Sequence, residues 1–244
     1  VTSACVRLVN LNRYGGQNLL VNNNTLTLEG STKYGIYSQF YNRINIAENT
    51  IRMNNPIGGA IGIMSENLQN SNVFCNDAIG ANRNNDVIGF NFHLSPGNIL
   101  TCNAAESMAR GLYFKNSNIG TQYFGERYDN IGTYGLVYNE EAVTGLQDFV
   151  GNNWVSHTSG GNTYDAYHES GSNGLINLSK HTFGSGQGSN FIPNWNTAAG
   201  NSNNWFSGFS NSNNYMCSPP YCNGGVGANI TEDPTGVFEK EKEG

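Results

Sequence analysis

The sequence predicts an all-β fold, a right-handed parallel β-helix of about five to six coils followed by a loop-rich C-terminal cap. Two short motifs recur along residues 4–150 at nearly the same interval, and each belongs to a run of three to five residues that alternates apolar and polar side chains. Such runs are too short for independent sheets and lack the helical period. If each repeat is one coil, every strand pairs in parallel with its copy about 4.8 Å away.

The first motif is a glycine followed by an apolar residue. The glycines recur after 27, 27, 22 and 24 residues. Glycine suits a bend where a Cβ atom would be crowded, and strand alternation then predicts which neighbours face the core. The glycines are Gly35, Gly62, Gly89, Gly111 and Gly135; the inward residues are Ile36, Ile63, Phe90, Leu112 and Leu136; the outward residues are Tyr37, Met64, Asn91, Tyr113 and Val137.

The second motif is centred on asparagine. Asn24, Asn49, Asn76 and Asn103 recur after 25, 27 and 27 residues, in step with the glycines. Asparagine tolerates the left-handed backbone of a corner, and amides stacked in line can share hydrogen bonds. We therefore expect these residues to form a structural ladder rather than a ligand site.

Five cysteines raise the question of disulfides. Cys217 and Cys222 bracket a Pro-Pro turn, a short loop that a disulfide could close in an oxidising compartment; two unrelated thiols are the alternative. Cys75 and Cys102 fall in the same register of neighbouring coils, which predicts stacked buried thiols, with a disulfide between the coils as the alternative. A zinc site is disfavoured because no second ligand pair lies nearby.

The predicted domains are a parallel β-helix over residues 1–155, a loop-rich cap packed on its end over residues 156–236, and a linker or the start of a following element over residues 237–244. The cap is expected where the periodicity gives way to Gly, Ser, Asn and Thr, with scattered tryptophans as anchors. The first residues include no initiator Met and no signal-peptide core, so the chain is interpreted as a mature or excised piece of a longer exported protein.

The amino-acid composition argues against nucleic acid as a partner of this chain and against a membrane span. Only 12% of the 244 residues are charged, with a net charge of −6, whereas nucleic-acid binding needs clustered Lys and Arg. No apolar run approaches the ~18 residues that would span a bilayer. We expect an extracellular or outer-surface location and a polysaccharide or protein partner at the cell surface, besides flanking domains of the same polypeptide.

A resemblance follows from these motifs. Asn49-Thr50-Ile51 and Gly35-Ile36-Tyr37 resemble the coils of right-handed parallel β-helix repeat proteins, a superfamily that includes pectate lyases, polygalacturonases and many adhesins. Later motifs resemble the region after the helix in long secreted surface proteins of the Bacteroidota, which implies export and a C-terminal sorting domain. They are Gly151-Asn152-Asn153-Trp154, Asn190-Phe191-Ile192-Pro193, Asn204-Trp205-Phe206 and the Cys217–Cys222 segment.

The signatures of the enzymes with this fold are missing. Inverting hydrolysis needs two carboxyl groups about 6.5–9.5 Å apart, yet the Asn-Thr-Asp, Asp-Asp, Gly-His-Gly and Arg-Ile-Lys motifs of polygalacturonases do not occur. The only concentration of titratable groups, a candidate for catalysis or metal binding, is His157, Asp165, His168 and Glu169. We expect no cofactor, with calcium as the alternative.

Tyr37 and Tyr113 are candidate carbohydrate platforms, because a tyrosine ring covers the apolar face of a sugar; a stacking ladder that serves stability is the alternative. The leading hypothesis is a non-catalytic extracellular surface module, adhesin-like or carbohydrate-facing. The alternatives are a polysaccharide-active lyase or glycoside hydrolase and a structural segment of a surface filament or secretion assembly.

Overall fold

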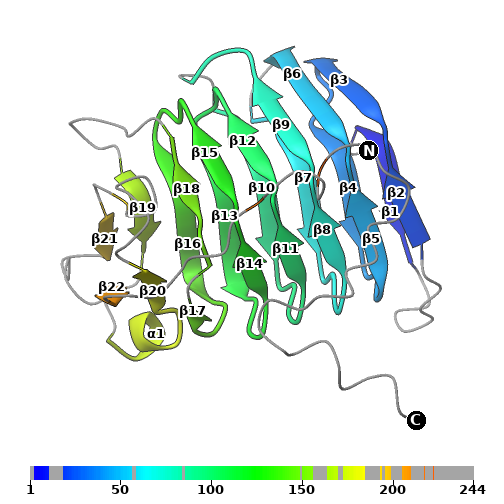
Figure 1. Cartoon of the computed structure of the whole chain (residues 1–244). Coiled ribbons are helices and arrows are strands. Elements are labelled where there is room, and N and C mark those ends of the chain that lie inside the picture. Colours follow the sequence, from blue (N-terminus) through cyan, green and yellow to red (C-terminus); the bar gives the residue numbers. More distant parts are fainter. Residues whose placement is uncertain are drawn as a thin grey trace.

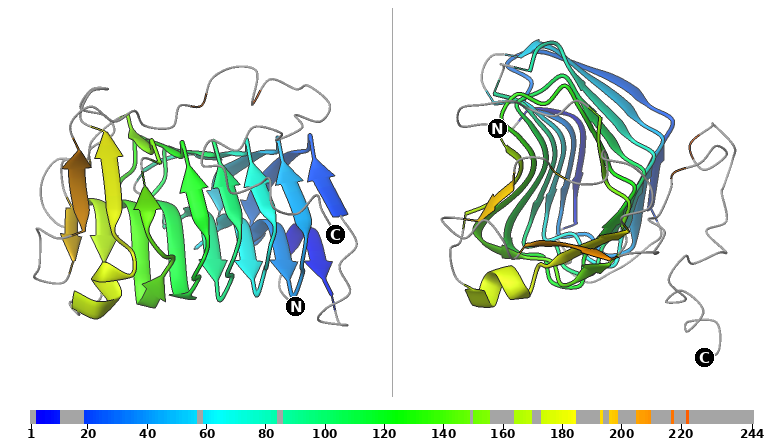
Figure 2. Two further views of the ribbon diagram at one scale, coloured as in Figure 1. Left: turned by 60° about the horizontal axis from the view of Figure 1, so that its bottom comes forward. Right: turned by 60° about the vertical axis from the view of Figure 1, so that its left-hand side comes forward.

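The chain forms a parallel β-solenoid of about six turns, which confirms the predicted parallel β-helix (Figure 1). The computed structural model describes residues 3–10, 19–56, 59–83, 86–148, 150–155, 164–169, 173–184, 193, 196–198, 205–209, 217 and 222. Three parallel sheets, here named A, B and C, run along the solenoid and enclose its core (Figure 2).

Each of the first five turns contributes one strand to each of these sheets. Sheet A consists of β1 (Ala4–Val9), β4 (Tyr34–Gln39), β7 (Ile61–Glu66), β10 (Ile88–His93), β13 (Arg110–Ser117), β16 (Tyr134–Val143), β19 (Tyr164–His168) and β21 (Asn196–Ala198). Sheet B consists of β2 (Leu19–Asn22), β5 (Ile44–Ala47), β8 (Asn72–Phe74), β11 (Ile99–Thr101) and β14 (Gln122–Phe124). Sheet C consists of β3 (Thr25–Gly30), β6 (Thr50–Pro56), β9 (Asp77–Gly80), β12 (Ala104–Glu106), β15 (Arg127–Asp129) and β18 (Asn153–Trp154).

Parallel pairing continues past residue 155, where the sequence predicts the end of the helix. Strands β19 and β21 extend sheet A, and β17 (Gln147–Asp148), β20 (His181–Gly184) and β22 (Phe206–Phe209) form a fourth parallel sheet, sheet D. The short helix α1 (Asn173–Asn177) lies between β19 and β20 in the chain. The described part of the expected cap therefore adds strands to the solenoid as well as covering its end.

The glycines of the first motif have no room for a side chain. A Cβ atom on Gly111 would lie 2.5 Å from the Gly135 carbonyl oxygen and 2.6 Å from Cδ1 of Tyr128. The apolar residues that follow the glycines are buried in the main core, with at most 1% of their surface exposed. Glycine is thus needed here because the next coil and sheet C approach too closely for a Cβ atom.

The asparagines of the second motif form one ladder between sheets B and C. Nδ2 of Asn24 donates to Oδ1 of Asn49 at 2.8 Å, and the same bond joins Asn49 to Asn76 and Asn76 to Asn103 at 2.9 Å. The backbone N–H of each donor residue reaches the same oxygen. The ladder therefore satisfies backbone and side-chain donors at a buried corner.

The left-handed corner itself lies one residue earlier than the sequence predicts. Positive φ angles occur at Asn23 (55°), Glu48 (55°), Cys75 (55°) and Cys102 (57°), each directly before a ladder asparagine. In the following coils Gly125 and Gly151 have this conformation. The prediction that the ladder asparagines occupy the left-handed position is wrong, because the preceding residue makes the turn and the asparagine itself stacks on its copies in the neighbouring coils.

Candidate binding face on sheet A

The outer face of sheet A presents three rows of side chains that run along the solenoid, because parallel strands in register place equivalent residues side by side. The strands curve, so this face is concave (Figure 2). The first row contains Tyr34, Ile61, Ile88, Arg110, Tyr134 and Tyr164; the second Tyr37, Met64, Asn91, Tyr113, Val137 and Tyr167; the third Gln39, Glu66, His93, Lys115 and Asn139.

Three half-buried tyrosines form a cluster at one end of this face, here named the tyrosine cluster. The ring centroids of Tyr134 and Tyr167 lie 4.9 Å apart, and those of Tyr134 and Tyr164 lie 6.2 Å apart with nearly parallel planes. Tyr164 and Tyr167 are also 6.2 Å apart. Burial raises the pKa of Tyr134, Tyr167 adds to the rise, and the Arg110 guanidinium opposes it. The cluster offers partly exposed ring surface from two adjacent strands.

The cluster was not predicted from the sequence, because residues 164–168 lie in the segment expected to form the cap. Tyr164 pairs with Tyr134 and Tyr167 pairs with Val137 in the register of sheet A. Asp165 occupies the position of the glycine in the first motif, so the segment lacks the most visible mark of that motif. The spacing of Tyr164 and Tyr167, which matches that of Tyr34 and Tyr37, is the remaining signal.

Tyr37 is more enclosed than a ligand platform requires. Its side chain is 8% exposed, its ring lies 5.3 Å from that of Tyr34, and the Arg7 guanidinium lies 6.0 Å from its ring centroid. Its hydroxyl donates to Oε2 of Glu66 at 2.7 Å, and Nε2 of Gln39 donates to the same oxygen at 2.9 Å. Burial, together with this bond to Glu66, raises the pKa of Tyr37 well above its ordinary value. These contacts fix Tyr37 as part of the sheet.

Tyr113, the second predicted platform, lies in the same row three strands further along. It is half-buried, and its hydroxyl accepts a hydrogen bond from Nδ2 of Asn139. Tyr113 pairs with Val137 on one side and with Asn91 on the other. Its ring is thus available at the middle of the face, where it adjoins amides rather than other tyrosines.

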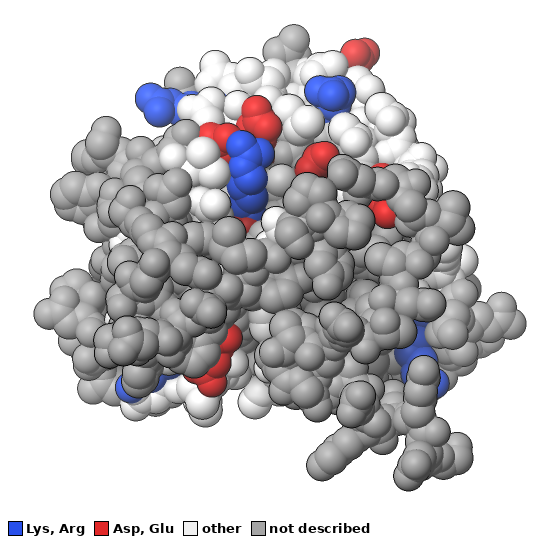
Figure 3. Space-filling model, in the orientation of Figure 1, with Lys and Arg blue, Asp and Glu red and all other residues white. Residues whose placement is uncertain are grey.

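The third row carries charges of both signs. Glu66, His93 and Lys115 occupy neighbouring strands. Nε2 of His93 lies 2.9 Å from Nδ2 of Asn116, and Lys115 forms an ion pair with Glu140 at 2.9 Å, which raises the pKa of Lys115. The side of the molecule in Figure 3 also presents both acidic and basic side chains where the chain is described, and several of opposite charge lie side by side.

The predicted His–Asp–Glu cluster does not assemble in the described residues. The His168 ring is buried against Tyr138, 5.3 Å away and nearly parallel, and against the edge of Trp205. Burial lowers the pKa of His168 to about 4. Asp165 is also buried, whereas Glu169 is exposed and accepts a hydrogen bond from the Glu140 amide. His157 lies outside the described residues, and within them no group of three or more His, Cys, Asp or Glu could hold a metal ion.

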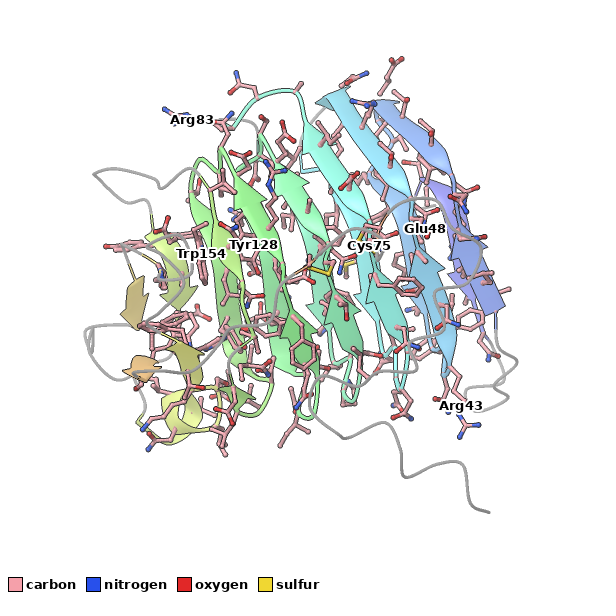
Figure 4. The ribbon with its side chains drawn as sticks, viewed as in Figure 1. Arg43, Glu48, Cys75, Arg83, Tyr128 and Trp154 are labelled. Carbon is pink, nitrogen blue, oxygen red and sulfur yellow. A yellow bond between two sulfur atoms is a disulfide. The ribbon has the colours of Figure 1, made fainter. Side chains whose placement is uncertain are left out.

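The cysteines pair differently from the prediction. Cys217 and Cys222 both form disulfides, but with Cys102 and Cys75 respectively rather than with each other (Figure 4). Cys75 and Cys102 are therefore not free stacked thiols, nor are they joined to each other. Both residues occupy the left-handed corner position that directly precedes a ladder asparagine.

Two further buried titratable groups were not singled out from the sequence. Glu126 takes the place of asparagine in the ladder: its Oε1 accepts from Nδ2 of Asn103 at 3.0 Å, and its backbone N–H donates to Oδ1 of Asn152 at 3.0 Å. Burial raises the pKa of Glu126 to about 8, against the lowering effect of the bonds from Asn103. His181 is buried beside Tyr123, whose hydroxyl contacts its Nε2, and burial lowers the pKa of His181 to about 3.

No protein-family model matches this chain, and neither the curated proteins nor the solved structures contain a match. Among the described residues, no helix has the length and apolar character needed to cross a membrane.

Proposed function

We propose that this chain is a non-catalytic extracellular module that binds a polysaccharide along the outer face of sheet A. The observation that carries the proposal is the tyrosine cluster, three partly exposed rings at the end of a concave face (Figure 2). A tyrosine ring can cover the apolar face of a sugar, and its hydroxyl remains free to bond with the sugar hydroxyls.

The distance between neighbouring strands of sheet A supports an elongated ligand. Neighbouring strands of a sheet lie about 4.8 Å apart, which is close to the length of one pyranose unit in an extended chain. Side-chain amides lie in the third row, at Gln39 and Asn139, and an amide both donates to and accepts from hydroxyl groups. A polysaccharide parallel to the solenoid axis would therefore meet equivalent positions from one coil to the next.

The disulfides support an extracellular location, because such bonds persist in oxidising compartments. A place on a bacterial cell surface, as in the Bacteroidota proteins that the later motifs resemble, belongs to the same proposal. Adhesion would then follow from a rigid solenoid that holds its binding face in a fixed geometry.

The test is titration of the oxidised protein with a panel of neutral and acidic polysaccharides, followed by calorimetry. We expect Tyr167→Ala and Tyr134→Ala to weaken binding about fivefold each, since aromatic contacts contribute about 1 kcal/mol. Tyr167→Phe should retain most of the affinity because the ring remains. The matched control is Leu20→Ala, which removes an exposed apolar side chain from sheet B.

Two results would contradict the proposal. One is a ligand that binds the wild type and all three tyrosine variants equally. The other is the appearance of new reducing ends or unsaturated uronate, which would identify the polysaccharide-active enzyme instead.

A further inference from the structure

The two disulfides close nested rings in the covalent chain. Cys75 and Cys222 are 147 residues apart in sequence, and Cys102 and Cys217 are 115 apart, so the second ring lies within the first. When the two ends of such a chain are pulled, the disulfide bond transmits the tension directly from one cysteine to the other. The longer path through the polypeptide then carries no load while the bond is intact.

Both rings are anchored at the same corner of the solenoid, in adjacent coils (Figure 4). Cys75 lies between β8 and β9, and Cys102 lies between β11 and β12. The amide of Cys75 donates to the Thr101 carbonyl at 2.9 Å, and that of Cys102 donates to the Phe124 carbonyl at 2.8 Å. Each anchor directly precedes a buried asparagine of the ladder, so a pull on either cysteine acts on a corner held by several hydrogen bonds.

The order of the pairs fixes the direction of the returning chain. Cys217 joins the later coil and Cys222 joins the earlier one. From Cys217 to Cys222 the chain therefore runs in the direction of the N-terminal coils, and Sγ of Cys217 lies 3.2 Å from the Gly125 carbonyl oxygen. Of the two cysteines, the one nearer the C-terminus is thus attached to the earlier of the two coils.

We propose that the disulfides act as a force bypass that keeps residues 76–221 unloaded when the chain is pulled by its two ends. Each coil of a solenoid contacts only its neighbours, so tension on an unbridged solenoid would remove coils one by one from the end. Here tension passes from residue 75 through the outer bond to residue 222. The inner bond provides a shorter bypass if the outer one is reduced.

The residues that the bypass keeps free of tension include most of the proposed binding face, with Tyr113 and the tyrosine cluster. Tyr34 and Tyr37 precede Cys75 and bear the tension. Its existence does not depend on polysaccharide binding, because it follows from the positions of the bonds alone. A module that bears load between its ends would keep this part of sheet A folded while its first coils extend.

The expected lengths follow from the sequence separations. An extended chain spans about 3.4 Å per residue. The outer bond therefore removes about 500 Å from the extension of the unfolded chain, corresponding to its 147 residues. The inner bond alone removes about 390 Å, corresponding to its 115 residues.

Single-molecule force spectroscopy on the full chain, held by its two termini, tests this. We expect the oxidised protein to extend about 500 Å less than the same protein in dithiothreitol. Under constant force, reduction of the outer bond should give a first step of about 110 Å and reduction of the inner bond a second step of about 390 Å.

Paired variants separate the two bonds. Cys102→Ser with Cys217→Ser should extend like the oxidised wild type, whereas Cys75→Ser with Cys222→Ser should extend about 110 Å further. Cys5→Ser, which touches neither bond, is the control. Full extension of the oxidised wild type would overturn the proposal. So would unfolding of residues 76–221 before either bond is reduced, detected as steps beyond the length of the loaded residues. If a paired variant fails to fold, the comparison of oxidised and reduced wild type still decides.

Discussion

Replacing Glu126 by glutamine should stabilise the protein at neutral pH and leave its stability unchanged in acid. Glu126 is 1% exposed and holds a ladder position that asparagine occupies in the preceding coils. Its carboxyl group must give up hydration there, and its charged form is supported only in part by the bonds from Asn103. Glutamine keeps the shape and the acceptor oxygen but never ionises.

The size of the effect follows from the pKa of Glu126, which rises from 4.5 to about 8 on folding. Below pH 4.5 the carboxyl group is protonated in both states and costs nothing. Between pH 4.5 and 8 the unfolded chain loses the proton while the folded chain keeps it, so the free energy of unfolding falls by about 1.4 kcal/mol per pH unit. The variant should therefore gain about 3 kcal/mol over the wild type at pH 7, and about 5 kcal/mol above pH 8.

The assay is urea denaturation of both proteins, disulfides intact, from pH 4 to pH 9. The difference between the two free energies of unfolding isolates Glu126, because the other titratable groups are shared. The reasoning is refuted if this difference stays constant between pH 5 and 8, or if the variant is less stable than the wild type at pH 7.

Three other substitutions test the core, each by the same denaturation. His168 stays neutral in the fold while it gains a proton in the unfolded chain, so its contribution to the free energy of unfolding should fall as pH drops from 6.5 toward 4. The difference in free energy of unfolding between the wild type and His168→Phe isolates this contribution, because Glu126 and the other titratable groups are shared, and a difference that stays constant over this range would contradict it. Gly111→Ala should lower the free energy of unfolding by about 1–3 kcal/mol, since its Cβ atom would meet Gly135 and Tyr128. An unchanged free energy of unfolding would show that the sheets can separate there. Asn76→Ala should cost about 2–4 kcal/mol by leaving two buried donors of the ladder unsatisfied, and a loss under 1 kcal/mol would mean that water replaces the amide.

The sequence predicts the central coils well because two different steric and hydrogen-bonding requirements recur there once per coil. One is the absence of a Cβ atom at positions such as Gly62, and the other is an amide at positions such as Asn76. Each need depends only on the neighbouring coil, so it recurs wherever coils are stacked. Because both requirements arise from contacts between adjacent coils, the same residue types repeat along the chain, and the fold can be predicted from one sequence.

The candidate site was less predictable because it depends on coils where the pattern changes. Asp165 replaces the glycine and Glu126 replaces the asparagine, so the last coils carry the same register with different residues. The disulfides were mispredicted because the short spacing of Cys217 and Cys222 suggests a local loop, whereas their partners lie more than a hundred residues away. Pairing over such a distance is set by the assembled solenoid.

The nested rings also bear on the order in which the molecule matures. During synthesis Cys75 and Cys102 emerge long before their partners, and neither ring can close until the last coils and the chain beyond them have been made. Correct pairing further requires that coils from both parts of the chain already share one stack. Oxidation of these four cysteines therefore requires completed assembly. A chain truncated before Cys217 would keep its coils but carry unpaired thiols at Cys75 and Cys102 in addition to the free Cys5, and an oxidising compartment could distinguish it from the finished protein by these two additional thiols.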